Sequence, residues 1–498
     1  MSETIQEKIY KGRWLVLITV IVGTFLGRLD QTIVGLATPK IIDDFGITVS
    51  AAGWISTAYI IANAVFVPIW GKLGDLVGRK KVYILGFLIF IFGSVLAGFA
   101  WDLSSMIVFR VIQAIAGSAD YPTAMSILVF TFTDDKERAK ALGIWSAAFA
   151  AAAVFGPLIG GPLIDNFGWP SIFLLNLPVG IIGLVMAIVF VHESKNEKDD
   201  SRKFDWFGAL SLGVALASLV LVLEKGNEWG WSSINSLISY IVTLVSGFVF
   251  VVIEKKQEEP IVDLKFFKNS VFVAVLVNNF IVFMGMMGAI FLIPVFAQIF
   301  LGYGATATGL LFMPMAFAMM LSAPFGSGFA DKFGGRNVIL FSSIVATAGI
   351  FGFTFIDPKS GPMGIMIPLF IMALGMGFGM APRTNIVSTA VPKNEIGSAS
   401  SVLALVRNIS GAFGIALFTT IFTNSTKGYL SEVLNSSTIN NIRQVNMQDF
   451  VALAYLKAQI LAYKEVFFVS TGISILGILS SFLIKVDKNK KMEKVHVE

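Results

Sequence analysis

Long apolar runs alternate with short polar stretches along the whole chain. Each run has about the length that crosses a lipid bilayer, for which an α-helix needs ~20 apolar residues. Strands of a membrane β-barrel would instead alternate with period two over about 10 residues. The pattern therefore predicts an all-α integral membrane protein with about 14 transmembrane helices. The runs lie at residues 14–38, 51–70, 82–100, 105–132, 140–164, 171–191, 206–223, 234–253, 271–300, 308–330, 338–356, 363–390, 399–422 and 464–484.

The composition excludes a soluble protein and several kinds of chemistry. Of the 498 residues, 55% are hydrophobic and 14% are charged, whereas an ordinary soluble domain carries about 25% charged residues. The absence of cysteine excludes disulfides and thiolate metal sites. The two histidines, His192 and His496, are too few for a histidine-rich metal site. No catalytic cluster lies outside the predicted spans, so we expect neither an enzyme nor a cofactor.

The positions of the basic residues predict the membrane orientation. The formal net charge is +5, which alone is compatible with nucleic-acid binding. With the N-terminus inside, however, 18 Lys and Arg fall in inner loops and 7 in outer loops, as the positive-inside rule requires. We therefore expect no nucleic-acid partner, both termini in the cytoplasm, and a multi-pass protein of the cell (inner) membrane. The first run is too long for a signal peptide and is interpreted as a retained helix.

Two loops carry the same pattern of glycine, aspartate and arginine. They are residues 71–79 and 328–336, in which Asp75 and Gly78 match Asp331 and Gly334 at a shift of 256. This repeat pairs the first six predicted helices with the last six. The seventh and eighth are left over as an inserted hairpin. We predict a six-helix bundle over residues 1–197, the hairpin with its linkers over 198–260, and a second six-helix bundle over 261–498. Two halves around a midplane site are the plan of a secondary transporter.

The repeated loop has the chemistry of a gate between helices. Gly71 permits close backbone approach, Gly78 permits a turn, and Asp75 can accept bonds from a helix N-terminus or from a basic side chain such as Arg79. The alternative is a basic loop that only sets orientation. The second copy contains Asp331, Gly334 and Arg336. This loop resembles the signature of the major facilitator superfamily, although Leu76 replaces the basic residue usual there.

A cluster of small residues marks the run at 140–164. Gly156, Pro157, Gly160 and Gly161 stand at a spacing that lets two helices pack closely, and the proline bends its helix. A plain packing motif would look similar. The string is similar to the antiporter signature of exporters in the same superfamily, and that resemblance implies export.

The first run and the sixth extend the resemblance. Residues 29–34 read Leu-Asp-Gln-Thr-Ile-Val, and Asn176 and Pro178 stand in the sixth run. Together with the helix count and the hairpin, they are similar to the fourteen-helix drug:proton antiporter family. The resemblance implies a proton-coupled exporter of amphipathic small molecules that works by alternating access, with the proton gradient as its energy source. We expect it to act as a monomer in the bilayer.

Ionisable residues inside spans are costly and need a reason. Asp30 and Arg110 lie at similar depths in antiparallel helices, so we expect them to pair. In the family the corresponding residues, with Gln113 one turn further, support proton coupling. A static ion pair is the alternative.

Asp120 is the best candidate for a combined proton and substrate site. It lies about 15 Å along the helix from Arg110, and desolvation favours the neutral form of a carboxyl group. A fixed pair with an arginine is the alternative. Arg383 is expected at the same level in the opposite half, and Arg28 is a second unusual cation. Because both residues are cations, an anionic or lipid-like substrate is an alternative to a cationic drug.

Three further features give weaker signals. Arg407 is interpreted as structural. Phe283, Met286 and Met287 are interpreted as ordinary membrane-helix residues, although such side chains also suit adaptable binding walls. The outer segment 424–463 contains apolar stretches that could form a helix lying on the membrane surface. A channel is a further alternative to a transporter, but the repeated gate loops favour rocking of two halves.

Overall fold

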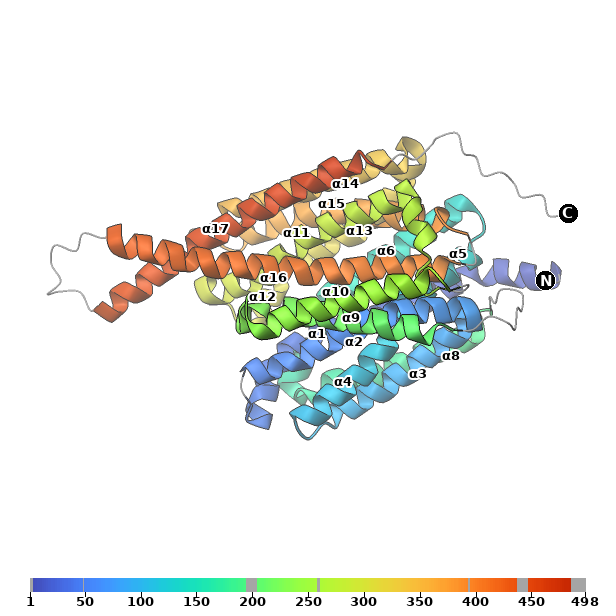
Figure 1. Cartoon of the computed structure of the whole chain (residues 1–498), viewed down its shortest axis with the longest axis horizontal. Helices are drawn as coiled ribbons and strands as arrows, with labels where there is room; N and C mark the ends of the chain where they lie inside the picture. The colour runs from blue at the N-terminus through green and yellow to red at the C-terminus, as the bar shows by residue number, and fades with distance from the viewer. Residues whose placement is uncertain are drawn as a thin grey trace.

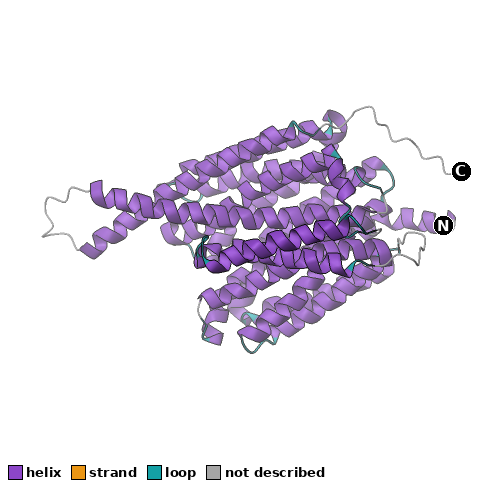
Figure 2. Ribbon diagram, in the orientation of Figure 1, coloured by secondary structure: helices purple, strands orange, loops and turns teal. Residues whose placement is uncertain are grey.

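The structure is a computed structural model that describes residues 3–47, 49–193, 204–257, 260–392, 395–436 and 447–484. Every regular element among these residues is helical (Figure 2). The first group of helices is α1 (Glu3–Phe45), α2 (Val49–Val77), α3 (Arg79–Gly98), α4 (Leu103–Gly117), α5 (Asp120–Thr131), α6 (Asp135–Phe167), α7 (Pro170–Leu174) and α8 (Asn176–Phe190). Two more follow as α9 (Trp206–Trp229) and α10 (Ile234–Glu254). The last group is α11 (Ser270–Leu301), α12 (Ala305–Leu310), α13 (Met313–Phe333), α14 (Gly335–Gly352), α15 (Met363–Thr389), α16 (Ile396–Ser436) and α17 (Met447–Ser481).

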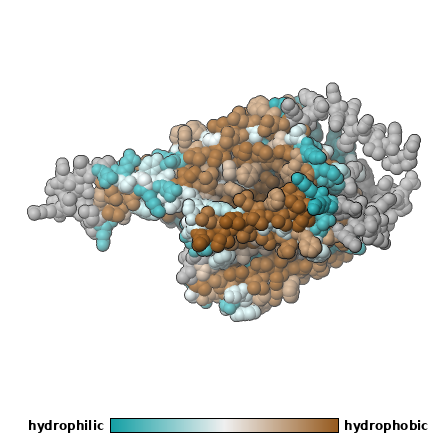
Figure 3. Space-filling view, viewed as in Figure 1, coloured by the Kyte–Doolittle hydropathy of each residue, from teal (hydrophilic) through white to brown (hydrophobic). Residues whose placement is uncertain are grey.

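The helices run roughly side by side along the long axis of the molecule (Figure 1). The start of α1 and the end of α17 lie at the same end, which we call the terminal end; the opposite end is the far end. A broad apolar band covers the middle of the visible face, and hydrophilic residues gather toward the two ends (Figure 3). Twelve spans within the described residues are long and apolar enough to cross a membrane. The chain is therefore a multi-pass membrane protein.

Two of the predicted spans are not among these twelve. The run at 105–132 is interrupted, since α4 ends at Gly117 and α5 begins at Asp120. Pro122 lacks the N–H that would bond to the carbonyl of residue 118, which favours this break. The other is α6, which has 33 residues and is thus about 50 Å long.

The helices pack as two groups with a pair between them. In the first half, α1 to α8, α1 packs against α6 and α8, and α3 packs against α4. In the second half, α11 to α17, α14 packs against α15, and α11 packs against α16 and α17. The halves meet where α6 packs against α13 and where α2 packs against α16. The pair α9–α10 contacts both halves, because α9 packs against α2 and α16.

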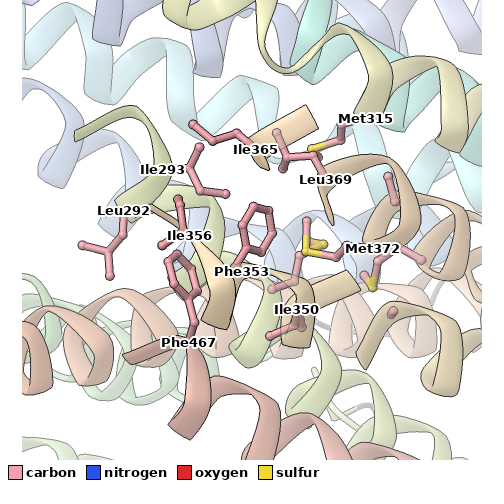
Figure 4. Close-up of a cluster of buried hydrophobic side chains, with 14 of the residues drawn as sticks. Leu292, Ile293, Met315, Ile350, Phe353, Ile356, Ile365, Leu369, Met372 and Phe467 are labelled. Carbon is pink, nitrogen blue, oxygen red and sulfur yellow. The ribbon is translucent and has the colours of Figure 1, made fainter. Parts of the chain in front are cut away.

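The largest buried apolar cluster lies within the second half (Figure 4). In it the rings of Phe353 and Phe467 stack with their centroids 5.1 Å apart. Nearby, glycines allow α14 and α15 to touch. A Cβ at Gly349 would overlap the backbone of Met372, and a Cβ at Gly375 would overlap that of Ala346. Small residues at helix contacts are how membrane helices gain van der Waals packing.

The segment 424–463 does not form a surface-lying helix. Its described residues continue α16 up to Ser436 and begin α17 at Met447, and both helices project beyond the rest of the molecule at the far end (Figure 1). Side chains there, such as Leu453, are exposed. Residues 437–446 lie outside the described part of the chain. The prediction failed because no helix-breaking residue ends either helix at the edge of its apolar run.

Replacing Gly375 by valine should destabilise the second half. The added side chain must push α15 away from α14, and such overpacking costs about 1–3 kcal/mol. Thermal unfolding of the purified protein in detergent measures the loss. Gly472→Val is the matched control, because a Cβ at this helical glycine meets nothing within 4 Å. Equal melting temperatures for the two variants would contradict the packing argument.

Candidate functional site

A cavity of about 390 Å³ lies between the two halves, within the size range of small-molecule sites. Its walls are mostly apolar and come from helices of both halves and from α9. Met286, Met287 and Phe283 of α11 are among them, so residues interpreted as ordinary helix positions in fact line the cavity. Their spacing of three and four residues, which puts them on one helix face, was the available signal. The other apolar or aromatic lining residues include Tyr59, Ile60, Tyr121, Phe149, Met315, Met319, Met380 and Ile415.

Four charged side chains reach the cavity wall: Arg28, Arg110, Arg407 and Glu224. Arg28 donates to Oε1 of Gln31 at 2.7 Å and lies 4.1 Å from the centre of the Phe149 ring. Arg407 was interpreted as structural, but it lines the cavity. It also joins the two halves, because its Nη1 donates to the hydroxyl of Tyr121 at 2.7 Å.

Glu224 was missed because the apolar run at 206–223 ends one residue before it. The helix continues through Glu224 to Trp229, so the residue belongs to a span rather than to a loop. An acidic residue directly after an apolar run, with no turn residue before it, was the signal in the sequence.

Asp30 and Arg110 are in contact, as their depths predict. Arg110 Nη1 donates to Asp30 Oδ2 at 2.6 Å. Asp30 Oδ1 accepts from Gln113 Nε2 at 2.8 Å and from Asn176 Nδ2 at 3.0 Å. All four side chains are buried. Both oxygens of this carboxylate are thus occupied by donors, one of them a guanidinium, which is a strong arrangement for a charged group inside a bundle.

Asp120 has a much poorer set of partners. Its Oδ2 accepts from Thr24 Oγ1 at 2.8 Å, and Thr24 in turn accepts from Trp145 Nε1 at 2.9 Å. Its Oδ1 is buried without a hydrogen-bond partner. Within the described part of the chain, no ion pair includes Asp120. The alternative of a fixed pair with an arginine is therefore not seen in this structure.

Asp120 does not line the large cavity itself. It borders two small ones: an apolar space of about 30 Å³ beside Tyr83 and Phe87, and a second one next to the large cavity. This second small cavity has a volume of about 20 Å³, enough for a single water molecule. Arg28, Gln31 and Asn408 line both this cavity and the large one. Tyr121, the neighbour of Asp120 in the chain, also lines both. Asp120 is thus separated from the large cavity by a polar space the size of one water.

Arg383 does not lie in the cavity, contrary to the prediction. It is fully buried within the second half, where its Nε donates to Asn278 Oδ1 at 2.8 Å. Its Nη2 lies 3.4 Å from Ser343 Oγ. The depth of the residue along its helix follows from the sequence, but its direction depends on free space. The glycine at position 379 leaves the space that the guanidinium fills. Arg407 takes the place on the cavity wall that was predicted for Arg383.

The first copy of the repeated loop joins the halves at the terminal end. Asp75 Oδ1 accepts from Arg79 Nη2 at 2.9 Å, and its Oδ2 accepts from the backbone N of Ser398 at 2.9 Å. Ser398 lies in the first turn of α16, where unpaired N–H groups favour an anion. A Cβ at Gly71 would lie 2.7 Å from the carbonyl oxygen of Gly397. Gly78 has a φ of 120°, a value that favours glycine.

The second copy keeps the turn but not the contact. Gly334 has a φ of 86°, so it occupies the same kind of turn as Gly78. Asp331, however, is exposed, and none of the hydrogen bonds or ion pairs given by the described residues joins it to the first half. Arg336 lies 5.5 Å from the centre of the Phe482 ring in its own half. The two copies of the repeat therefore share the glycine turn, but only the first copy bonds to the other half.

The glycines of α6 pack against α1. A Cβ at Gly156 would overlap Thr32, and a Cβ at Gly160 would overlap Ile33. A Cβ at Gly161 would lie 3.4 Å from Thr306 Oγ1 in the second half. The side chain of Pro157 lies outside the described part of the structure. Since Thr32 lines the large cavity, this close packing helps to set the position of one cavity wall.

Replacing Asp75 by alanine should loosen the terminal end. The variant loses hydrogen bonds of a charged group, worth about 1.5–3 kcal/mol each, so the closed contact should open at least tenfold more often. The chain has no cysteine, so a Ser400→Cys reporter can be alkylated selectively with N-ethylmaleimide. Ser400 is buried at the contact, with Oγ 3.4 Å from the Pro122 oxygen. Asp331→Ala is the control and should leave the alkylation rate unchanged.

Comparison with known proteins agrees with this architecture. The Major Facilitator Superfamily model matches residues 20–415. The multidrug transporter protein MdtP of Bacillus subtilis (strain 168) is 33% identical over 425 residues, which cover 85% of this chain and 77% of MdtP. The riboflavin transporter RibZ of Clostridioides difficile (strain 630) is 32% identical over 416 residues, which cover 83% of this chain and 89% of RibZ.

A solved structure shares the fold. The crystal structure of the human organic anion transporter MFSD10 matches with a TM-score of 0.66 and 14% identity, covering 95% of this chain and 99% of that one. At this identity the likeness concerns the fold alone. The family model, by contrast, spans most of the sequence. The chain therefore belongs to the Major Facilitator Superfamily, whose members are membrane transporters rather than enzymes.

Proposed function

We propose that the protein is a proton-coupled antiporter that exports amphipathic small molecules, drugs among them, by alternating access. The family and the similarity to the multidrug transporter MdtP support drug export. The cavity between the halves supports it as well, because methionine and aromatic walls adapt to varied ligands. No cofactor is needed, since the proton gradient supplies the energy.

The observation that carries proton coupling is the contrast between two carboxylates in the first half. Both oxygens of Asp30 already accept hydrogen bonds from Arg110, Gln113 and Asn176, so we assign it a structural role. Asp120 has a single hydroxyl donor and an unpaired oxygen, so one of its oxygens is available to bind a proton. Asp120 is therefore the group that gains and loses the proton.

Coupling follows from the short path between Asp120 and the large cavity. The two sites share Arg28 and Gln31 in their walls, and a water-sized space joins them. A cationic group of a substrate in the large cavity is attracted to the ionised Asp120 carboxylate, and a proton on Asp120 removes this attraction. Proton and substrate thus favour different states of the same region. Such a differential effect is required, because a ligand with equal affinity for both states shifts nothing.

Alternating access requires the terminal end to open. In this structure Asp75 holds the first turn of α16, and Ser400 contacts Pro122, so the cavity is closed toward the terminal end. Release of Asp75 from Ser398 would allow the halves to separate there. We place the terminal end in the cytoplasm and the protein in the inner membrane, because the basic loops lie at that end. We propose that it acts there as a monomer.

The proposed topology has fourteen spans. It adds α6 and the broken pair α4–α5 to the twelve apolar spans. The pair α9–α10 is then a hairpin inserted between two six-helix bundles, with domain boundaries near 197 and 260. Residues 194–203 and 258–259, which contain the two linkers, lie outside the described residues.

Export of anionic or lipid-like substrates is a second candidate function. Arg28 and Arg407 lie on the cavity wall and bond to neutral groups, Gln31 and Tyr121. Two guanidinium groups without a carboxylate partner would attract an anionic substrate. Arg383, which the sequence offered for this role, is replaced by Arg407.

Replacing Asp120 by asparagine should uncouple transport from the proton gradient. In everted vesicles, uptake of ethidium by the wild type should rise when a pH gradient is imposed and should fall when that gradient is collapsed. Asp120→Asn should lose this gradient dependence, about tenfold or more for a typical coupling free energy. If Asp120→Asn keeps the gradient response of the wild type, the assignment of the proton to Asp120 is wrong.

Replacing Asp30 by asparagine should have a different effect. It leaves the Arg110 guanidinium buried without a carboxylate, and breaking a buried ion pair costs about 3–5 kcal/mol. The variant should therefore show a lower melting temperature and lower folded yield than Asp120→Asn, as measured by size-exclusion chromatography and thermal unfolding. Asp331→Asn, at an exposed carboxylate, is the control for both variants.

A further inference from the structure

We infer that Glu224 of α9 is the acidic pole of a two-pole binding cavity, which selects aromatic substrates that carry a cationic group. The two arginines Arg28 and Arg407 form the opposite, basic pole, so that a zwitterionic amphiphile fits best. The inference rests on the proposed function, because it names the substrate class of the same cavity.

The position of α9 brings Glu224 to the cavity from outside the two halves. The helix packs against α2 and α16, at the seam where the halves meet. On one side of Glu224, Leu223 is buried against Ala412 and Ala416 of α16. On the other side, Lys225 lies 5.0 Å from a ring centre of Trp54 in α2. Glu224 stands between these two contacts and lines the cavity.

Glu224 differs from the other charges of α9 in having no partner. Lys225 Nζ donates to Glu228 Oε2 at 3.0 Å, so these two opposite charges form an ion pair with each other. None of the hydrogen bonds or ion pairs given for the described residues includes Glu224. A carboxylate within a membrane span is costly unless it is paired or faces a cavity. Glu224 faces the cavity, and a cationic ligand would supply the missing partner.

The charges that line the cavity are separated into two poles. Arg110 is neutralised by Asp30, which leaves Arg28 and Arg407 against Glu224. The contacts of Leu223 place Glu224 near the level of residues 412–416 of α16. Arg407 lies five to nine residues earlier in that helix, or about 7–13 Å along its axis. An aromatic molecule with a cationic group and an anionic group at opposite ends spans such a distance, and the methionines and aromatic rings that line the same cavity suit its apolar body.

Three dyes with one xanthene scaffold test the two poles separately. Rhodamine B carries a cationic xanthene and a free carboxylate, rhodamine 6G is a cation whose carboxyl group is esterified, and fluorescein is an anion. Binding to the purified protein in detergent is measured by fluorescence anisotropy without any proton gradient. We expect the wild type to bind rhodamine B most tightly.

Glu224→Gln should weaken binding of both rhodamines about tenfold, the effect of ~1.4 kcal/mol in affinity, and leave fluorescein bound as tightly or more tightly. Glu224→Asp keeps the charge and should retain rhodamine binding. Arg407→Gln should weaken rhodamine B and fluorescein but not rhodamine 6G. Glu228→Gln, one turn further along α9 and more than half exposed, is the matched control and should bind all three dyes like the wild type.

Two outcomes would overturn the inference: unchanged rhodamine binding in Glu224→Gln, or an equal loss of all three dyes, which would indicate a structural role. Gradient-driven export of rhodamine B in everted vesicles is measured in parallel. If Glu224 controls binding but no pH gradient drives export, the proposed proton coupling fails and the substrate class stands. If export responds to the gradient and Glu224→Gln binds like the wild type, the proposed function stands and the inference on Glu224 fails.

Discussion

The cost of placing a charge inside an apolar membrane bundle governs the organisation of this protein. Asp30 meets that cost by complete pairing, because three donors from two helices, α4 and α8, bond to its two oxygens. Arg383 meets it by burial among polar side chains of its own half. Four other charged side chains border cavities between the helices instead: Asp120, Arg28, Arg407 and Glu224. Apart from Arg383, these charges without an ion-pair partner thus lie beside cavities between the helices.

Hydropathy was sufficient to predict where the helices lie in the sequence, but not how each helix is rotated about its own axis. The apolar runs located nearly every span, because each must bury or expose an apolar surface of bilayer length. The repeated loop was also predictable, since Gly78 and Gly334 both need a positive φ. The direction of a side chain around its helix depends on neighbours far away in the sequence. This is why Arg383 and Arg407 exchanged their expected places, and why Asp75 docks on α16 while Asp331 remains exposed.

Local backbone chemistry explains the remaining differences. The break between α4 and α5 places Asp120 at a helix start, where Pro122 cannot continue the hydrogen-bond ladder of α4. Glu224 was missed because the apolar run ends just before it and Gly226 and Asn227, which commonly end helices, follow; the helix nevertheless continues to Trp229. Hydropathy is therefore least informative about the end of a span where a charged residue follows an apolar run. Glu224 is such a residue, and it reaches the cavity.

The seam between α2 and α16 connects these observations. At the terminal end it is closed by Asp75 and Ser398, and further along it is covered by α9. Because α9 touches one helix of each half, a motion that separates α2 from α16 must change at least one of its two contacts. Ala412 and Ala416 offer a smooth surface to Leu223, whereas Lys225 is held over Trp54. The contact with α16 is also polar, because the Thr420 hydroxyl of α16 donates to Asn227 Oδ1 of α9 at 2.8 Å and Trp231 Nε1 donates to Thr420 Oγ1 at 3.0 Å. Since α9 is held by both halves, opening of the seam must break one of these two sets of contacts.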